Sequence, residues 1–369
     1  MRIARVDVYA YELTYVGGAY AMSGGRIVEG LTSTVVRVTT DDGTEGFGET
    51  CPLGPAYLEA HAGGAQAALR ELAPAALGLD PREPWVVADH MDAALRGHAY
   101  AKSALDVACW DVLGRASGLP VCSALGGRRQ ASFPLYVAIS LGSPEAMADT
   151  VEQLRSEGIH RFQLKLGADP HEDAARVRAV LDATSDEDLV VADANGGWRL
   201  ADAMTAARLL DGLPRLVFEQ PCPTLEECLS VRRHTSLPFV LDEVITGVDS
   251  FLRAWQARGM DGINLKLSKV GGLTRARQLR ELAETVGVSL TIEDTWGGDL
   301  ATAAVAHLAA TTRPETLLTV SFMNDWTREH VAGHEPRSEN GRGAAPGAPG
   351  LGLDVELEAL GEPLFSVAA

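Results

Sequence analysis

The hydrophobic and polar positions of the chain change their spacing at about residue 132. Before it, apolar and polar residues alternate as in strands, and alanine-rich stretches then follow with helical spacing. These predicted strands and helices lie at residues 2–14, 32–40, 59–78 and 87–116. After residue 132, short apolar runs that end in polar residues alternate with amphipathic helical segments. The pattern predicts an α+β domain over residues 1–125 and a repeated β/α domain over 126–340.

The second part contains eight short apolar runs, with predicted helices between most of them. The eight candidate strands are residues 133–139, 161–166, 189–192, 215–218, 238–241, 262–265, 289–292 and 316–320. Such repetition favours an α/β fold in which the strands close into a barrel. A doubly wound sheet is the alternative, but no GxGxxG motif follows any of the runs. The tail 341–369, rich in Gly, Pro and Ala, is expected to wrap back over the first domain.

Charged residues close five consecutive runs of this predicted barrel. They follow one another at separations of 23 to 28 residues, each a plausible length for one β/α unit. In order, they are Lys165, Asp193, Glu219, Asp242 and Lys266. Because the active site of such a barrel lies at the carboxyl ends of its strands, we expect these side chains to gather at one site.

Three neighbouring carboxylates would repel one another unless a cation lay between them. Oxygen ligands favour a hard ion, so Asp193, Glu219 and Asp242 are predicted to bind Mg²⁺. Glu243 should point to the other face, since adjacent strand residues alternate. Lys165 and Lys266 would flank the ion as acid and base, with pKa values lowered by burial and by the cation. This arrangement suits removal of a proton next to a carboxylate.

Other catalytic and metal-binding motifs are missing from the sequence. There is no HExxH pair for zinc and no GxSxG elbow for a serine nucleophile. A single acid at a strand end is more often a helix cap or an ion pair than a ligand, but five charged residues in register are hard to explain in that way. Lys102 and Lys269 are expected to be solvated lysines.

Composition and charge narrow the class of protein. The chain has 369 residues, 46% of them hydrophobic and 22% charged, as in an ordinary globular enzyme. The net charge of −18 disfavours nucleic-acid and membrane partners, so the expected partner is a small molecule. Five cysteines without a CxxC pair indicate reduced thiols, and no signal-like segment opens the chain, so a cytoplasmic location is expected.

Two segments resemble the enolase superfamily, in its muconate-lactonizing subgroup. Residues 266–272 (KLSKVGG) are similar to the family's strand-six segment, and residues 46–49 (GFGE) to a turn of its N-terminal domain. The resemblance implies a (β/α)₇β barrel, residues 126–340, under an α+β capping domain, residues 1–125 joined by the tail 341–369. It also implies Mg²⁺ on the three acids, the two lysines as catalytic groups, and a homo-oligomer.

The chain departs from the subgroup at strand two. The subgroup carries Lys-x-Lys there, whereas this chain has Gln163-Leu164-Lys165. Without the outer lysine, the metal and burial must lower the pKa of Lys165 to a greater extent. Gln163, Asn195 and Glu243 are expected to lie behind the ligands and the base and to support them.

Further segments are similar to the branch of the subgroup that acts on proline derivatives: residues 97–104, 162–167 and 292–299. That branch includes cis-3-hydroxy-L-proline dehydratases and proline-betaine epimerases. The resemblance is greater to the first and implies α-proton removal through a metal-stabilised enediolate, loss of the hydroxyl and formation of Δ1-pyrroline-2-carboxylate. The same two lysines could instead epimerise a cyclic amino acid, so both outcomes stay open.

The ring nitrogen of such a substrate, a secondary ammonium, needs an anionic or aromatic partner. Asp294, at the end of strand seven, is the predicted anion, and Glu293 is its rival because the register decides which one points inward. Trp296 could line the pocket. Tyr20 and Tyr57, in predicted loops of the first domain, could close over the substrate.

Overall fold

The computed structural model describes all residues, Met1–Ala369, and its larger part is an eight-stranded parallel sheet. The strands follow one another in chain order: β7 (Val137–Ile139), β8 (Arg161–Lys165), β9 (Leu189–Asp193), β10 (Leu216–Glu219), β11 (Phe239–Leu241), β12 (Gly262–Lys266), β13 (Ser289–Glu293) and β14 (Leu317–Val320). A bridge between Leu135 and Val320 brings the first and last strands together. The predicted α/β barrel is confirmed.

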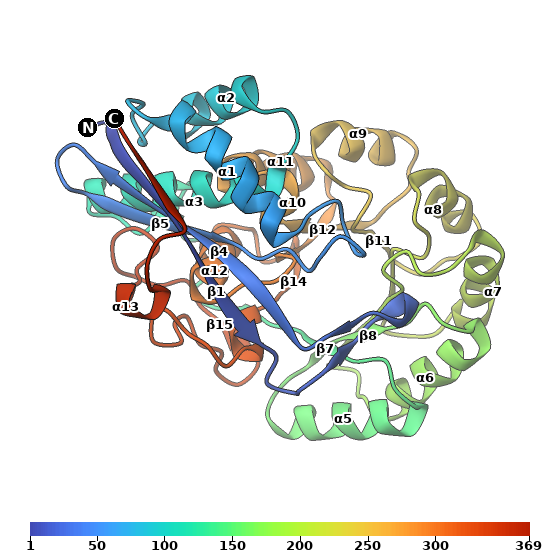
Figure 1. Cartoon of the computed structure of the whole chain (residues 1–369). Coiled ribbons are helices and arrows are strands. Elements are labelled where there is room, and N and C mark those ends of the chain that lie inside the picture. The colour runs from blue at the N-terminus through green and yellow to red at the C-terminus, as the bar shows by residue number, and fades with distance from the viewer.

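Helices connect the successive barrel strands and form an outer ring (Figure 1). They are α5 (Pro144–Ser156), α6 (Pro170–Asp182), α7 (Leu200–Leu210), α8 (Leu225–Arg232), α9 (Val248–Gln256), α10 (Leu267–Val270), α11 (Leu273–Val286) and α12 (Asp299–Ala310). The connection between β12 and β13 contains both α10 and α11. The eight strands are therefore joined by seven helical connections, which is the (β/α)₇β pattern. The strands are buried on both faces, which explains their continuous apolar runs.

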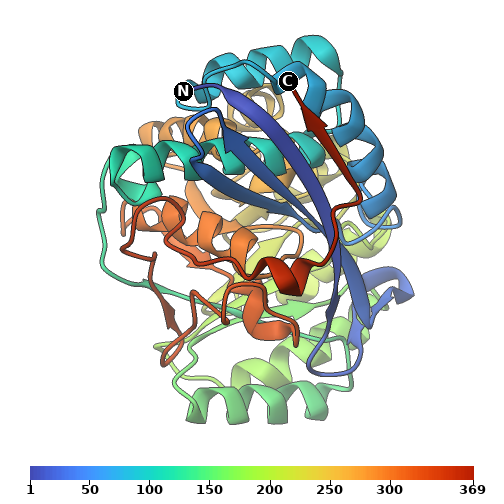
Figure 2. The ribbon, with the colours of Figure 1, turned by 60° about the vertical axis from the view of Figure 1, so that its left-hand side comes forward.

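A second, antiparallel sheet lies beside the barrel. Its order is β16-β1-β4-β5, and the C-terminal strand therefore pairs with the N-terminal one, as Figure 2 shows with the two termini close together. Its strands are β1 (Ile3–Thr14), β4 (Gly30–Thr40), β5 (Glu45–Thr50) and β16 (Phe365–Ala368). The helices of this part are α1 (Ala62–Ala76), α2 (Pro84–Ala94), α3 (Ala99–Ser117) and α4 (Val121–Ala124). We call the sheet with these helices the capping domain, and its limits at 125 and 341 remain our proposal.

Short elements complete the chain. They are β2 (Tyr20–Ala21), η1 (Ser23–Gly25), β3 (Ile27–Val28), β6 (Phe133–Pro134), η2 (Met323–Trp326), β15 (Arg342–Gly343) and α13 (Leu357–Leu360). Tyr20 therefore lies on a short strand paired with β3, not in the loop that the sequence predicts. The tail also pairs with the start of the barrel, through β15 and β6.

Two predicted elements are interrupted in the structure. The predicted strand 133–139 is divided, because residues 133–134 pair antiparallel with the tail and the barrel strand starts only at Val137. The predicted helix 87–116 is two helices, since Gly97 and His98 adopt positive φ angles of 72° and 51° between α2 and α3.

The capping domain packs on its own core and directly against the barrel. Strand β5 runs so close to α3 that a Cβ on Gly46 would lie 2.4 Å from the Ala108 carbonyl, and one on Gly48 would lie 2.0 Å from that of Ala104. Only glycine permits this approach, which accounts for the GFGE segment. No helix is both long and apolar enough to cross a membrane.

Candidate active site

The strand register brings the predicted charged residues to one end of the barrel. Lys165 on β8 is the register partner of Asp193 on β9, which in turn is the partner of Glu219 on β10. On the other side, Lys266 on β12 is the partner of Glu293 on β13. Register partners in a parallel sheet project to the same face, so these side chains share the carboxyl end of the barrel.

Lys165 forms an ion pair with Asp193, the first of the predicted metal ligands. Its Nζ donates to Oδ2 of Asp193 at 2.6 Å, and both side chains are buried. Burial alone would lower the pKa of Lys165, but the charge of Asp193 and this hydrogen bond raise it above its usual value. The structure therefore shows a lysine held protonated by a carboxylate.

Asp242 lies between two lysines. Its Oδ2 accepts from Lys266 Nζ at 2.6 Å and from the Tyr57 hydroxyl at 3.2 Å, and its Oδ1 accepts from Lys269 Nζ at 2.7 Å. Burial would raise the pKa of Asp242, but the two lysines lower it below its usual value. The pKa of Lys266 is raised despite burial, because Asp242 and Glu293 face it. Asp242 is thus held as an anion.

Glu219 has no lysine partner. Its two carboxylate oxygens accept only from neutral amides, Asn264 Nδ2 at 3.0 Å and Gln163 Nε2 at 3.3 Å. Burial and the negative charges of Asp193 and Asp242 raise its pKa well above the usual value. An additional positive charge at this position would relieve that repulsion.

The three predicted ligands are not arranged as a finished metal centre. No group of three or more His, Cys, Asp or Glu side chains has the geometry to hold an ion, since Asp193 and Asp242 are turned onto lysines. The chemistry of the donors still fits a hard cation: the three acids are adjacent in the barrel, offer only oxygen, and leave Glu219 without a counter-ion. The fit to Mg²⁺ therefore rests on charge and donor type.

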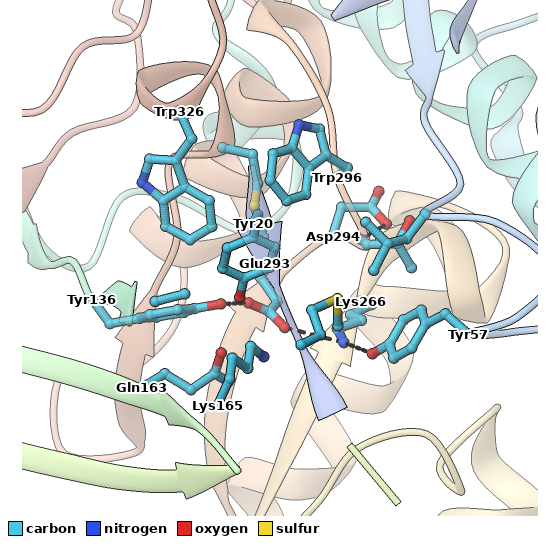
Figure 3. Close-up of a pocket in the computed structure, with 15 residues that line it drawn as sticks. Tyr20, Tyr57, Tyr136, Gln163, Lys165, Lys266, Glu293, Asp294, Trp296 and Trp326 are labelled. Atoms are coloured by element: carbon cyan, nitrogen blue, oxygen red, sulfur yellow. Dashed lines mark hydrogen bonds and ion pairs between the residues drawn. The ribbon is translucent and has the colours of Figure 1, made fainter. Parts of the chain in front are cut away.

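Most of the predicted catalytic and substrate-binding residues line one small cavity, of about 30 Å³, at the mouth of the barrel (Figure 3). By this measure it has room for about one or two water molecules. Its polar lining residues include the two lysines and the two acids at the end of β13: Gln163, Lys165, Lys266, Glu293 and Asp294. The capping domain contributes Tyr20, Met22, Leu53 and Tyr57.

The two acids of β13 both line the cavity but have different partners. Glu293 accepts from Asn264 Nδ2 at 2.6 Å and from the Tyr136 hydroxyl, and it lies 3.4 Å from Lys266 Nζ. Asp294 accepts from the amide of Thr295 at 2.7 Å and from the amide and hydroxyl of Ser268. Burial raises the pKa of Asp294 to about 6. Neither residue is turned away from the cavity.

Aromatic rings form much of the remaining wall. Trp296 stands edge-on to Trp326, with ring centroids 5.8 Å apart, and Tyr20 lies 5.7 Å from Trp296. Figure 3 shows the two tryptophan rings on the side of the cavity opposite the lysines, with Tyr20 between. A wall of this kind suits the apolar carbons of a small ring and attracts a positively charged nitrogen.

Asn195 and Glu243 do not line the cavity and are linked to the proposed ligand Asp193, whereas Gln163, which the sequence analysis groups with them, does line it. The backbone amide of Asn195 donates to Asp193 Oδ1 at 2.8 Å, and its side-chain amide donates to Glu243 Oε1 at 3.1 Å. Glu243 does not line the cavity, and burial raises its pKa to about 7. It faces an open groove of about 680 Å³, which also touches Lys269 and Tyr57.

The prediction that Lys102 and Lys269 are solvated is wrong. Lys269 is 4% exposed, because its Nζ donates to Asp242 Oδ1 and to the carbonyls of Asp242 and Asn264. Lys102 is 7% exposed and forms an ion pair with Asp92 at 2.7 Å. Both pairings depend on how the chain folds, so no local pattern reveals them.

Sequence reasoning missed several residues of the site. Asn264 could have been found, since it precedes Lys266 by two positions and strand periodicity places both on one face. Tyr136 lies just before the short strand β7, and Met323 and Trp326 lie in the 3₁₀ helix η2 after the last strand. No motif marks these three.

In comparison with known proteins, each of the two parts of the chain matches a family model. Residues 146–359 match the family model described as enolase C-terminal domain-like, and residues 22–126 match that of the mandelate racemase/muconate lactonizing enzyme N-terminal domain. The first match alone covers more than half of the chain. These assignments agree with the barrel and the capping sheet seen in the structure.

Individual relatives match over nearly the whole length. A cis-3-hydroxy-L-proline dehydratase from Roseibium aggregatum is 45% identical over 99% of both chains, and muconate cycloisomerase 1 from Pseudomonas putida is 32% identical over 89% of both. A mandelate racemase/muconate lactonizing enzyme-type structure from Roseovarius nubinhibens, complexed with magnesium, has a TM-score of 0.97 at 37% identity over 100% of both chains. The chain belongs to the mandelate racemase/muconate lactonizing enzyme proteins of the enolase superfamily.

Proposed function

We propose that this protein is a Mg²⁺-dependent hydro-lyase that converts cis-3-hydroxy-L-proline to Δ1-pyrroline-2-carboxylate. The observation that carries the proposal is the pair of buried lysines, on β8 and β12, that face one cavity among strand-end carboxylates. The 45% identity with a dehydratase of this substrate, over 99% of both chains, supports the choice of substrate.

The proposed ligands of the ion are Asp193, Glu219 and Asp242. When bound there, Mg²⁺ would supply Lewis-acid stabilisation of the negative charge that develops on the substrate carboxylate. An ion held by Asp193 and Asp242 would compete with Lys165 and Lys266 for these carboxylates, and would so weaken the ion pairs that raise the pKa values of the two lysines. A neutral lysine can then accept a proton.

The two lysines divide the proton transfers. In cis-3-hydroxy-L-proline the hydroxyl and the carboxylate share one face of the ring, so the α-hydrogen lies on the other and elimination is anti. Lys165 Nζ accepts the α-proton, and Lys266 Nζ donates a proton to the hydroxyl as the C3–O bond breaks and water leaves. The resulting enamine tautomerises to Δ1-pyrroline-2-carboxylate. The reverse assignment of the two lysines satisfies the same balance, and a test of it is given below.

Substrate recognition is assigned to the β13 end and the walls of the cavity. Asp294 lines the cavity with its carboxylate fixed by Ser268 and Thr295, so it is the proposed partner of the ring ammonium. Glu293 is already shared between Asn264 and Tyr136 and is assigned a supporting role. Trp296, Tyr20 and Tyr57 would enclose the ring.

A second candidate activity is 2-epimerisation of proline betaine or a related cyclic amino acid. The aromatic wall of Tyr20, Trp296 and Trp326 favours it, since such rings can hold a quaternary nitrogen. The acids Glu293 and Asp294 in the same cavity favour a protonated amine instead. Dehydration therefore remains the leading proposal.

Proton NMR in D₂O tests both candidates. The protein is incubated with Mg²⁺ and, in separate samples, cis-3-hydroxy-L-proline, L-proline and L-proline betaine, beside a Lys165→Ala variant and a Lys102→Ala control. We expect the hydroxyproline signals to give way to those of Δ1-pyrroline-2-carboxylate with the wild type and the control only. Inversion of the betaine without dehydration would move the assignment to the epimerase. No change in any sample would refute both activities.

A further inference from the structure

Helix α12 begins directly after the cavity-lining segment of the barrel, and its own sequence leaves its N-terminus uncapped. The N-cap residue is Gly298, which offers no side-chain acceptor. The first amides of a helix need acceptors, especially when buried. Residues 293–296, which end two positions earlier, contribute Glu293, Asp294, Thr295 and Trp296 to the cavity. The position of this helix end therefore sets one wall of the proposed substrate site.

Glu49, from the capping domain, supplies the missing cap. Its Oε1 accepts from the amide of Gly298 at 2.9 Å, and its Oε2 accepts from the amide of Ala301 at 2.9 Å. On its own side, the same carboxylate accepts from the Tyr11 hydroxyl at 2.8 Å and from the Ser33 hydroxyl at 2.6 Å. Glu49 is 2% exposed. A carboxylate at a helix N-terminus is also favoured by the helix dipole.

Two neighbouring features show that residues of both domains accommodate this contact. A Cβ on Gly298 would lie 2.1 Å from the Tyr11 hydroxyl oxygen and 3.2 Å from Glu49 Oε1, so only glycine leaves room for the acid. Two residues after Glu49, the carbonyl of Cys51 accepts from the Thr295 hydroxyl at 3.0 Å. The end of β5 is thus tied to the segment 295–301 at three points.

We propose that Glu49 is a positioning residue that fixes the substrate-binding wall formed by Asp294, Thr295 and Trp296. The inference rests on the proposed function for the identity of the substrate, but not for the contact itself. Glu49 does not line the cavity, so it acts only through the segment that it holds. If Asp294 and Trp296 recognise the ring nitrogen, a shift of this wall weakens substrate binding more than it slows proton transfer at Lys165 and Lys266.

The molecule contains a matched control for this role. Helix α11 also has a glycine N-cap, Gly272, and a capping-domain acid, Asp106, accepts from the amide of Thr274 at 3.0 Å. Both acids therefore join the capping domain to a barrel helix. The difference is that the nearest preceding cavity residue is Lys266, eight positions before Thr274 and beyond the short helix α10.

The experiment compares Glu49→Gln, Glu49→Asp and Asp106→Asn with the wild type in the presence of Mg²⁺. A glutamine places an N–H opposite Gly298 or Ala301, whereas aspartate keeps the charge but not the reach. We expect Glu49→Gln to raise KM for cis-3-hydroxy-L-proline at least tenfold with kcat within about threefold. Glu49→Asp should give a smaller rise. Asp106→Asn and Glu49→Gln should lower Tm by similar amounts, but Asp106→Asn should leave KM unchanged.

Hydrogen–deuterium exchange gives a readout that needs no turnover. In Glu49→Gln, amides of residues 293–301 should exchange faster, whereas in Asp106→Asn the faster exchange should lie at 272–276. An unchanged KM together with unchanged exchange at 293–301 would overturn the inference, as would a fall in kcat with KM unchanged. A wild type that is inactive refutes the proposed substrate instead, and the exchange measurement then decides on Glu49 alone.

Discussion

Two regions of this protein bury ionisable side chains in opposite ways. At the strand ends, Lys165, Lys266 and Asp242 remain charged because each has an oppositely charged partner within 2.6 Å. At the interface of the two domains, Asp106 and His307 have mainly neutral partners. Burial there raises the pKa of Asp106 to about 7 and lowers the pKa of His307 to about 4. The ion pairs at the strand ends stabilise charge, whereas burial suppresses it at these two interface groups and also at Glu219, the strand-end acid without a lysine partner.

The difference shows where in the fold buried side chains keep their charge. A buried charge without a partner is costly, so a purely structural group drifts towards its neutral form. Counter-ions that keep lysines and carboxylates charged are found where the cavity lies, and they come from strands that are neighbours in the barrel. Paired buried charge in a cavity therefore marks the candidate site better than acidity or basicity alone.

The largest expected effect is the loss of one charged partner in the strand-end region. Lys266→Ala should lower kcat for dehydration at least about 10³-fold, because the group that donates the proton to the leaving hydroxyl is removed. The fold should persist, as judged by circular dichroism. Lys102→Ala, which removes a buried lysine far from the cavity, should retain activity and serves as the control.

A comparison of Lys165→Ala with Lys266→Ala decides which lysine is the base. L-Proline has no hydroxyl to lose, so exchange of its α-proton in D₂O reports the base alone. If Lys165 is the base, Lys266→Ala still exchanges the proton and Lys165→Ala does not. The opposite pattern would reverse the roles, and full dehydratase activity in either variant would contradict the mechanism.

The next prediction concerns two of the proposed metal ligands. Glu219→Gln and Asp242→Asn should each weaken Mg²⁺ binding at least about 100-fold by isothermal titration calorimetry. Without the metal, the two substitutions should change Tm in opposite directions. Glu219→Gln removes repulsion and should raise Tm by a few degrees, whereas Asp242→Asn removes the carboxylate partner of Lys269 and leaves Lys266 with Glu293 alone, so it should lower Tm. Equal shifts in the two variants would show that Glu219 and Asp242 do not differ in charge balance.

The third prediction tests the neutral region through pH. His307 donates from Nε2 to the Leu351 carbonyl and accepts the Cys122 amide at Nδ1, and burial lowers its pKa to about 4. The unfolded chain binds this proton near pH 6.5 and the folded protein only near pH 4, so folding stability falls as pH drops through this window. The expected contribution of His307 to this loss is about 3 kcal/mol. Urea unfolding at several pH values measures it. In His307→Gln, the loss between pH 6.5 and 4 should be smaller by this amount, and an unchanged pH dependence would contradict the assignment.

The sequence predicted the parts of the site that follow from strand periodicity. Lys165, Asp193, Glu219 and Lys266 end strands of similar spacing, so register alone brings them to the same end of the barrel. The barrel itself was predicted for the same reason, from eight repeated units. Whether these residues act as base, acid and ligands stays a prediction that the experiments above test.

Contacts between distant segments could not be predicted in this way. Lys269 looked solvated because its partners, Asp242 and Asn264, come from two other positions in the barrel wall. Trp326 lies in the short 3₁₀ helix η2 after the last strand, and its contact with Trp296 depends on how the chain returns over the barrel. The division of strand 133–139 likewise depends on pairing with the tail at residues 342–343. Tertiary packing, not local pattern, decides each of these features.

The smallest expected effect concerns Tyr57, a neutral group placed against the charged region. Its hydroxyl contacts both Lys266 Nζ and Asp242 Oδ2, but Lys266 keeps Asp242 and Glu293 as partners when that hydroxyl is removed. Tyr57→Phe should therefore lower kcat by about tenfold to 100-fold, less than Lys266→Ala, since a hydrogen bond to a charged group contributes about 1.5–3 kcal/mol. Steady-state kinetics beside Lys266→Ala measures the ratio. A loss in Tyr57→Phe as large as in Lys266→Ala would mean that the hydroxyl itself carries a proton, and the division between charged chemistry and neutral support would fail at this residue.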